Sequence, residues 1–307
     1  MRKLTFRSVL LLLLSITIML GQGRRPAFAA AAVPIDLQVF PGFQRQLAPA
    51  TWLPVTIRLE TYNEPLDGEL VITIPHDYIL TGEATGTEYR LPLALPAFAR
   101  RTYRTTILNP VGAYSPPVVR VYSQGQLLTA HTLSLETAPP GRGILIVSDQ
   151  EFTTGFGIEQ PVFQLKPAFL PDNPVGYWGV EALLFDRADL TLLTALQIDA
   201  LVTWVRQGGT VILTGGNSQQ ALTAPLLARL TTCRFRQKTV VSLTGREETG
   251  LPFAEDLQWL ELFRVDPGDA EVLLTVQGYP LFLKERLGAG VCLIMTFDPF
   301  GPAFSAQ

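Results

Sequence analysis

Ser218 has the surroundings that most resemble those of an enzymatic nucleophile. It lies in the stretch "GNSQQ", residues 216–220, which is one glycine short of the G-x-S-x-G elbow of serine hydrolases. A serine nucleophile also needs an imidazole within hydrogen-bond reach. The chain has two histidines, His76 and His131. The sequence around both predicts β-strands of the N-terminal domain, whereas Ser218 lies in the C-terminal domain. We therefore predict that Ser218 is not catalytic.

A phosphate-binding loop is the second chemistry that this stretch suggests. Glycines before a helix can bind an anion through free backbone N–H groups and the helix dipole. Gly215 and Gly216 stand alone, however, without the glycine spacing of a dinucleotide fold or a P-loop. The simpler interpretation is a tight turn between a strand and a helix.

Carboxylates offer the third possibility. Asp149, Asp186 and Asp298 each follow a predicted buried strand, and Asn217 follows a fourth. If the strands are parallel, these side chains gather at one sheet edge, where ligands of such folds bind. They could hold Ca²⁺ or Mg²⁺, or act as the acid and base of a polysaccharide hydrolase. Asp is also a common turn former and helix cap, and we predict no metal and no cofactor.

Aromatic side chains could serve a glycan. Trp178, in "VGYWGVE", precedes a strand and is expected to be exposed, as a sugar-stacking platform would be. Trp204 and Trp259 are expected in the core, the latter on an amphipathic helix. The irregular stretch over residues 153–179 is a candidate surface for a specific partner.

The elements that position these residues follow from hydrophobic patterning. Continuous apolar runs at residues 143–149 and 180–186 predict strands covered on both faces. Thr194 begins a helix, because Gln197 stands at the capping-box spacing, and Gly208-Gly209 ends it before the strand "TVILTGG". This strand, helix and strand predict a parallel sheet.

The rest of this half should extend that sheet. Thr223-Ala224-Pro225 predicts another helix start, with proline in the first turn. The runs "AEVLLTV", "YPLFLKERLG" and "GVCLIMTFD" are separated by short glycine-containing turns, which predicts an antiparallel addition.

The first half of the chain has another pattern. Between Pro34 and Glu136 about seven short runs of β-branched and aromatic residues alternate with turn residues, which is typical of an immunoglobulin-like sandwich. Val55, Ile57 and Leu59 should face its core.

The second half resembles the class I glutamine amidotransferase-like fold. The resemblance rests on "EALLFDRADLTLLTALQIDALVTWVRQGGTVILTGG" and "YPLFLKERLGAGVCLIMTFDP" and covers roughly residues 143–302. It implies a flavodoxin-like α/β domain of the non-catalytic kind found in exported, membrane-associated bacterial proteins. The catalytic cysteine elbow and the His-x-Glu pair of that family are absent here, so the resemblance implies a pseudoenzyme.

The N-terminus predicts export. Basic residues precede the apolar run from Val9 to Leu20, and Ala27-Phe28-Ala29 suits a signal-peptidase site. An uncleaved anchor is the alternative, and a C-terminal anchor could be missing. Cys233 and Cys292 could form a disulfide in that compartment, although Cys292 lies in an apolar strand where a free thiol is common.

These observations give one organisation: a signal peptide (residues 1–29), a β-sandwich (30–138), a linker (139–142) and an α/β domain (143–307). The net charge of −3 and the absence of a basic excess argue against nucleic acid. We expect a non-enzymatic binding or scaffolding protein of the cell envelope, with an envelope or membrane protein, or a glycan, as partner. The alternatives are an envelope polysaccharide hydrolase that uses the strand-end aspartates and a carbohydrate-binding module that uses Trp178.

Overall fold

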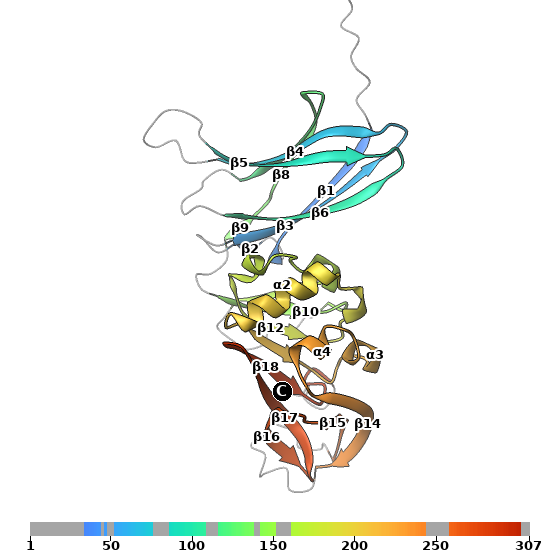
Figure 1. The fold of residues 1–307 in the computed structure, drawn as a ribbon, viewed down its shortest axis with the longest axis vertical. Coiled ribbons are helices and arrows are strands. Elements are labelled where there is room, and N and C mark those ends of the chain that lie inside the picture. The colour runs from blue at the N-terminus through green and yellow to red at the C-terminus, as the bar shows by residue number, and fades with distance from the viewer. Residues whose placement is uncertain are drawn as a thin grey trace, which may run out of the picture.

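The structure is a computed structural model that describes residues 34–43, 46–47, 52–75, 86–108, 116–137, 142–151, 161–243 and 258–301. The predicted signal peptide, His76 and most of the predicted linker lie outside these residues. Figure 1 shows two antiparallel sheets at one end of an elongated molecule and a larger sheet with the helices in the remainder.

Two antiparallel sheets make up the N-terminal part. One has the order β1-β3-β6 and the other the order β5-β4-β7-β8. Val55, Ile57 and Leu59 are fully buried between the sheets, which confirms the predicted alternation of the strand "LPVTIRLE". The strands are β1 (Ile35–Pro41), β3 (Trp52–Thr61), β4 (Leu66–Pro75), β5 (Gly86–Leu95), β6 (Arg100–Leu108), β7 (Val118–Ser123) and β8 (Gln126–Thr132), beside the short pair β2 (Gln46–Leu47) and β9 (Glu136–Thr137).

A seven-stranded mixed sheet forms the centre of the second part, in the order β11-β10-β12-β13-β18-β17-β16. Neighbours from β11 to β18 pair in parallel, and β17 and β16 add to β18 in antiparallel fashion. Both pairings agree with the sequence pattern. The strands are β10 (Gly143–Val147), β11 (Val162–Leu165), β12 (Val180–Phe185), β13 (Thr210–Leu213), β16 (Glu271–Val276), β17 (Tyr279–Leu287) and β18 (Gly290–Met295).

Helix α2 (Ala195–Arg206) joins β12 to β13 and begins with the predicted capping box between Thr194 and Gln197. It packs Leu201, Val205 and Trp204 into the core. Gly208 has a φ of +119°, and a Cβ on Gly209 would lie 2.5 Å from the Trp204 ring. The glycine pair therefore ends the helix and lets the chain pass the indole.

The predicted fold class, an immunoglobulin-like sandwich followed by a flavodoxin-like α/β domain, is wrong, and so is the resemblance to glutamine amidotransferases. The structure is a β-rich arrangement of several sheets with few helices. A doubly wound fold needs helices over both faces of its sheet. Of the three α-helices among the described residues, α3 (Gln219–Leu222) and α4 (Leu227–Leu230) have four residues each. Only α2 is long enough to cover a sheet face.

Strands replace helices after α4. The segment around Trp259, predicted as an amphipathic helix, is strand β15 (Trp259–Asp266), paired with β14 (Arg234–Ser242). Leu260 and Leu262 are buried whereas Trp259 is 60% exposed, so the alternating period of a strand decides this segment. The helix start predicted at Thr223 is also displaced, because Thr223 ends α3 and α4 follows Pro225.

Aromatic side chains join the two parts. Phe43, just after β1, stacks on Phe163 of β11 with 5.7 Å between ring centroids and belongs to the core of the second part. Arg104 of β6 donates a hydrogen bond from Nη2 to the Ala168 carbonyl at 2.9 Å. The two parts therefore share a packed junction.

Two further findings concern the cysteines and the membrane. Cys233 and Cys292 are both buried and free, and do not form a disulfide. Among the helices that the structure describes, none is long and apolar enough to cross a membrane.

Candidate functional site

The ends of four parallel strands meet at one edge of the large sheet, as the sequence predicts. β10, β12, β13 and β18 lead there into Asp149, Asp186, the Gly216 turn and Asp298 respectively. Backbone bonds connect the turns: the Asp186 N–H donates to the Val147 carbonyl at 3.1 Å. The polar residues at this edge, here called the strand-end cluster, are the candidate site of the second part.

Asp186 is the centre of the strand-end cluster and is completely buried. Its Oδ1 accepts a hydrogen bond from the Thr214 hydroxyl, which extends from the end of β13. Gly216 makes this close approach possible, because a Cβ there would lie 2.2 Å from the same oxygen. Gly216 is therefore needed because a larger residue would clash with the Asp186 carboxylate. This close packing, and not a phosphate ligand, accounts for the glycine.

Arg187 supplies the opposite charge. Its Nη2 lies 2.7 Å from Asp298 Oδ2, and its Nε lies 3.6 Å from Asp186 Oδ2. The second distance is an ion pair without a hydrogen bond, so Asp186 Oδ2 is buried with no hydrogen-bond partner. Arg187 holds this position with a φ of +48°, an uncommon backbone conformation for a side chain of its size.

The pKa of Asp186 is raised to about 6, chiefly because the side chain is buried and in smaller part because of the negative charge of Asp298. The Thr214 hydrogen bond and the Arg187 charge act in the opposite direction. A buried carboxylic acid that titrates near neutral pH is common in active sites. The Asp186 side chain, however, has no solvent-exposed surface.

Asn217 acts as a clamp between two turns. Its Oδ1 accepts from the Ala188 N–H at 3.1 Å, and its Nδ2 donates to the carbonyls of Phe185 and Thr214 at 2.8 and 2.9 Å. The side chain is 1% exposed. Its hydrogen-bonding groups are therefore occupied within the protein, and Asn217 holds the end of β12 against the end of β13.

Ser218 is a helix cap. Its Oγ accepts a hydrogen bond from the Ala221 N–H at 3.1 Å at the N-terminus of α3. His131 is exposed on β8, in the other part of the molecule. The structure therefore does not place an imidazole of the described chain beside this serine.

The remaining predicted residues are not in the buried centre. Asp149 is exposed and its Oδ2 accepts from the Asp189 N–H at 2.7 Å, which ties the turn after β10 to the turn after β12. Trp178 follows the 3₁₀ turn η3 (Pro174–Tyr177), precedes β12 and is 59% exposed, as predicted. It therefore lies at the opposite end of β12 from Asp186.

Most polar groups of the strand-end cluster are used in internal contacts, and the exception is Asp186 Oδ2, which has no hydrogen-bond partner. Within the described ranges, no group of three or more His, Cys, Asp or Glu side chains could hold a metal ion. The residues missed from the sequence are Arg187 and Thr214, which neutralise and hydrogen-bond Asp186. Their position next to the strand-end Asp and Gly residues is the signal that could have identified them, since a buried carboxylate requires partners.

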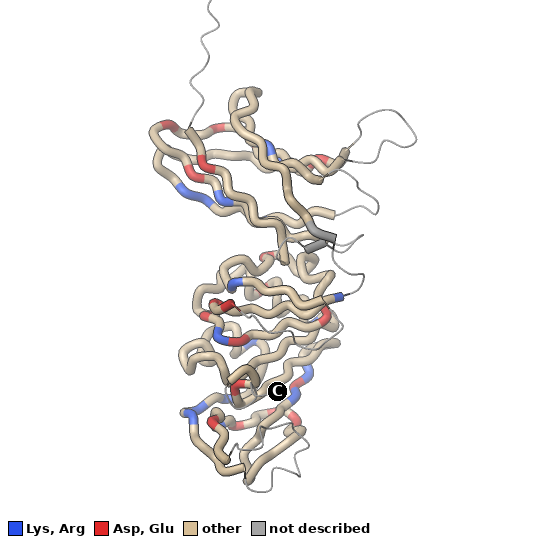
Figure 2. The backbone as a smooth tube through the Cα atoms, turned by 180° about the vertical axis from the view of Figure 1, so that it is seen from behind, with Lys and Arg blue, Asp and Glu red and all other residues tan. Residues whose placement is uncertain are grey.

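Charges elsewhere are mixed in sign. Figure 2 shows acidic and basic residues interspersed over both parts of the molecule, and many are paired on the surface.

Known proteins resemble this chain only partly. Residues 34–136, the two sheets of the N-terminal part, match the model of a domain of unknown function (DUF8726). No curated protein matches the chain.

Solved structures match parts of this chain at low TM-scores. The cytoplasmic protein STM1381 from Salmonella typhimurium LT2 is 12% identical with a TM-score of 0.40, over 54% of this chain and 91% of that one. A beta-glucosidase from Listeria innocua is 11% identical with a TM-score of 0.25, over 35% of this chain and 16% of that one. The Pseudomonas fluorescens alkylpurine DNA glycosylase AlkC is 19% identical with a TM-score of 0.26, over 36% and 31%. At these scores no function transfers, and the matched family model covers only residues 34–136, whose function is unknown.

Proposed function

We propose that the chain is a non-enzymatic binding or scaffolding protein of the cell envelope. The observation that carries this proposal is the state of the strand-end cluster. Asp186 and Asp298 share Arg187, Asn217 bonds three backbone groups, and Ser218 caps a helix. Groups committed to such contacts stabilise loops and are not available to a substrate.

The junction between the two parts supports a scaffolding role. Phe43 of the first part is buried in the core of the second, and Arg104 hydrogen-bonds across the junction. A packed and hydrogen-bonded junction restricts the relative motion that a flexible linker would permit. Such an arrangement holds two surfaces at a fixed separation, which suits a protein that connects partners.

The location in the envelope rests on the basic and apolar pattern of residues 1–29. It is tested by expressing the full chain, isolating it from the extracytoplasmic fraction and sequencing its N-terminus. We expect a mature chain that starts near Ala30. A chain that stays in the cytosol with residues 1–29 intact contradicts the location.

The non-enzymatic role is tested by incubating the purified chain with envelope polysaccharide and measuring new reducing ends. We expect no release above the level of the Asp186→Asn variant. Release by the wild-type chain that this variant and Asp298→Asn both abolish would show a hydrolase and overturn the proposal.

A further inference from the structure

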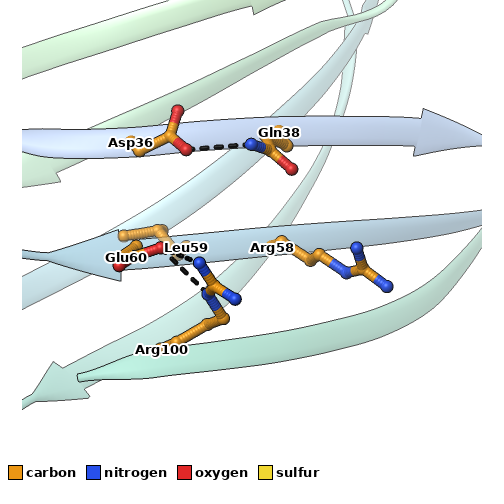
Figure 3. A pocket seen from close by; sticks show the side chains of 6 residues that line it. All are labelled: Asp36, Gln38, Arg58, Leu59, Glu60 and Arg100. Carbon is orange, nitrogen blue, oxygen red and sulfur yellow. Dashed lines mark hydrogen bonds and ion pairs between the residues drawn. The ribbon is translucent and has the colours of Figure 1, made fainter.

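A polar depression lies on the outer face of the β1-β3-β6 sheet. Asp36 and Gln38 come from β1, Arg58 and Glu60 from β3, and Arg100 from β6. Strand register explains the grouping, because Asp36 pairs with Glu60, Glu60 with Arg100 and Gln38 with Arg58. The residues that line this outer-face depression are Asp36, Gln38, Arg58, Leu59, Glu60 and Arg100 (Figure 3).

Two of the polar pairs in the depression are partly satisfied. Gln38 donates from Nε2 to Asp36 Oδ2 at 2.9 Å. Arg100 donates to Glu60 Oε2 from Nε at 2.9 Å and from Nη2 at 2.5 Å. Within the described chain, the second oxygens of both carboxylates accept no hydrogen bond, and they remain available as acceptors for a ligand.

Arg58 packs against two aromatic rings, whereas Arg101, which also forms no hydrogen bond or ion pair among the described residues, contacts only the Tyr103 ring. The guanidinium carbon of Arg58 lies 5.3 Å from the Phe40 ring centroid and 4.8 Å from that of Phe169, across the junction. Figure 3 shows the guanidinium extending along β3, away from Glu60 and Arg100. Among the described residues it forms no hydrogen bond and no ion pair, although a guanidinium carries five N–H donors.

Arg90, on the other sheet, shows what a fully paired surface arginine looks like here. It contacts both oxygens of Glu69 at 3.0 Å and Glu88 Oε2 at 2.7 Å. The N–H donors of Arg90 are therefore used in hydrogen bonds to two glutamates. Arg58, in contrast, is held by two aromatic rings, and its N–H donors are free to bind a ligand. A guanidinium held in this way is preorganised to bind a carboxylate with two parallel hydrogen bonds.

We propose that the outer-face depression binds an acidic saccharide, a sugar that carries one carboxylate per ring. The ligand carboxylate would lie on Arg58, and its hydroxyl groups would donate to Asp36, Glu60 and Gln38. Arg58 and Arg100 balance the charges of Asp36 and Glu60, so the depression has no excess positive charge of the kind that binds the phosphates of nucleic acid. The site deepens the proposed function, because it names the class of glycan for a non-enzymatic binding protein.

The test is a titration of the full chain with trigalacturonate and with neutral galactotriose, followed by saturation-transfer NMR and calorimetry. We expect trigalacturonate to bind with a dissociation constant on the order of 1 mM, because the site is small and open. The neutral sugar, which lacks the carboxylate, should bind at least about 10-fold more weakly. Equal binding of both sugars, or binding of neither, would overturn the proposal.

Variants assign the site. Arg58→Gln should weaken trigalacturonate binding at least about 10-fold, and Arg90→Gln, the matched surface control, should leave it unchanged. Gln38→Ala removes an acceptor without touching the junction and should weaken binding by a factor of about 3–10. If Arg58→Gln loosens the junction, the Gln38→Ala variant alone decides whether the sugar binds at the outer-face depression. Wild-type affinity in both Arg58→Gln and Gln38→Ala would overturn the proposal.

The trigalacturonate samples, examined for cleavage after binding, distinguish this binding proposal from the proposed non-enzymatic role of the protein. Recovery of intact trigalacturonate agrees with a non-enzymatic protein. Cleavage of the sugar together with lost binding in Arg58→Gln would contradict the non-enzymatic role while leaving the binding site supported.

Discussion

Arg187 and Asp298 form an ion pair at 2.7 Å although they are 111 positions apart in the chain. Each follows a parallel strand, β12 or β18, and the strand between them, β13, contributes the turn that holds Asn217. The pair thus joins the outer two of three neighbouring strand ends. Arg187 also provides the positive charge that the fully buried Asp186 requires.

Asp298→Asn should lower the free energy of unfolding by about 1–2 kcal/mol, because it removes a charge-assisted hydrogen bond from a partly buried arginine. Both side chains are 28% exposed, so solvent screens the pair only in part. Urea unfolding measures the change. Asp199→Asn, which breaks the exposed pair with Arg229, is the matched control and should cost less than about 0.5 kcal/mol. Equal costs for the two variants would contradict a special role for the pair.

Asp186→Asn should change the dependence of stability on pH. The folded-state pKa of about 6 lies above the ordinary value of 3.8, so the folded chain binds more protons than the unfolded chain between these values. Stability from this group is therefore present below pH 4 and is lost as the pH rises towards 6. The loss is at most about 3 kcal/mol.

Unfolding free energies measured from pH 4 to pH 7 test this prediction. The difference between the wild type and Asp186→Asn should fall as the pH rises through this window. Thr214→Val, which removes the hydroxyl that favours the ionised form, should move the window upward. A difference that rises with pH would show that the folded state lowers the pKa instead.

Gly216→Ala should destabilise the fold by about 2 kcal/mol or more, because its Cβ would lie 2.2 Å from Asp186 Oδ1. Gly179→Ala is the control, since a Cβ there meets nothing within 4 Å. Thermal unfolding compares the two. Equal melting temperatures would mean that the turn after β13 moves away from Asp186 at little cost.

Asn217→Ala and Ser218→Ala separate a clamp from a cap. The first leaves the buried Ala188 N–H without its acceptor and removes one of the hydrogen bonds to each of the Phe185 and Thr214 carbonyls, which should cost about 2–3 kcal/mol. The second removes one cap hydrogen bond from a four-residue helix and should cost about 1 kcal/mol. Chemical denaturation gives both values, and the reverse order would contradict these assignments.

Local signals in the sequence determined much of the secondary structure. The capping box at Thr194 and the glycine pair at Gly208 depend on residues a few positions apart, so the sequence alone places α2 correctly. Alternation in "LPVTIRLE" identifies β3 and its buried face for the same reason. The prediction that Asp186, Asn217 and Asp298 approach one sheet edge also held, because parallel strands bring their carboxyl ends together.

Tertiary structure decided what the local signals left open. The segment at Trp259 has apolar residues compatible with a helix or a strand, and pairing with β14 selects the strand, which removes the basis for the flavodoxin-like fold. Arg187 reaches Asp298, and Arg58 stacks on Phe169, only because the folded chain brings distant segments into contact. Sequence spacing encodes bonds between near neighbours, whereas burial and the pairing of charges depend on contacts that form when the whole chain packs.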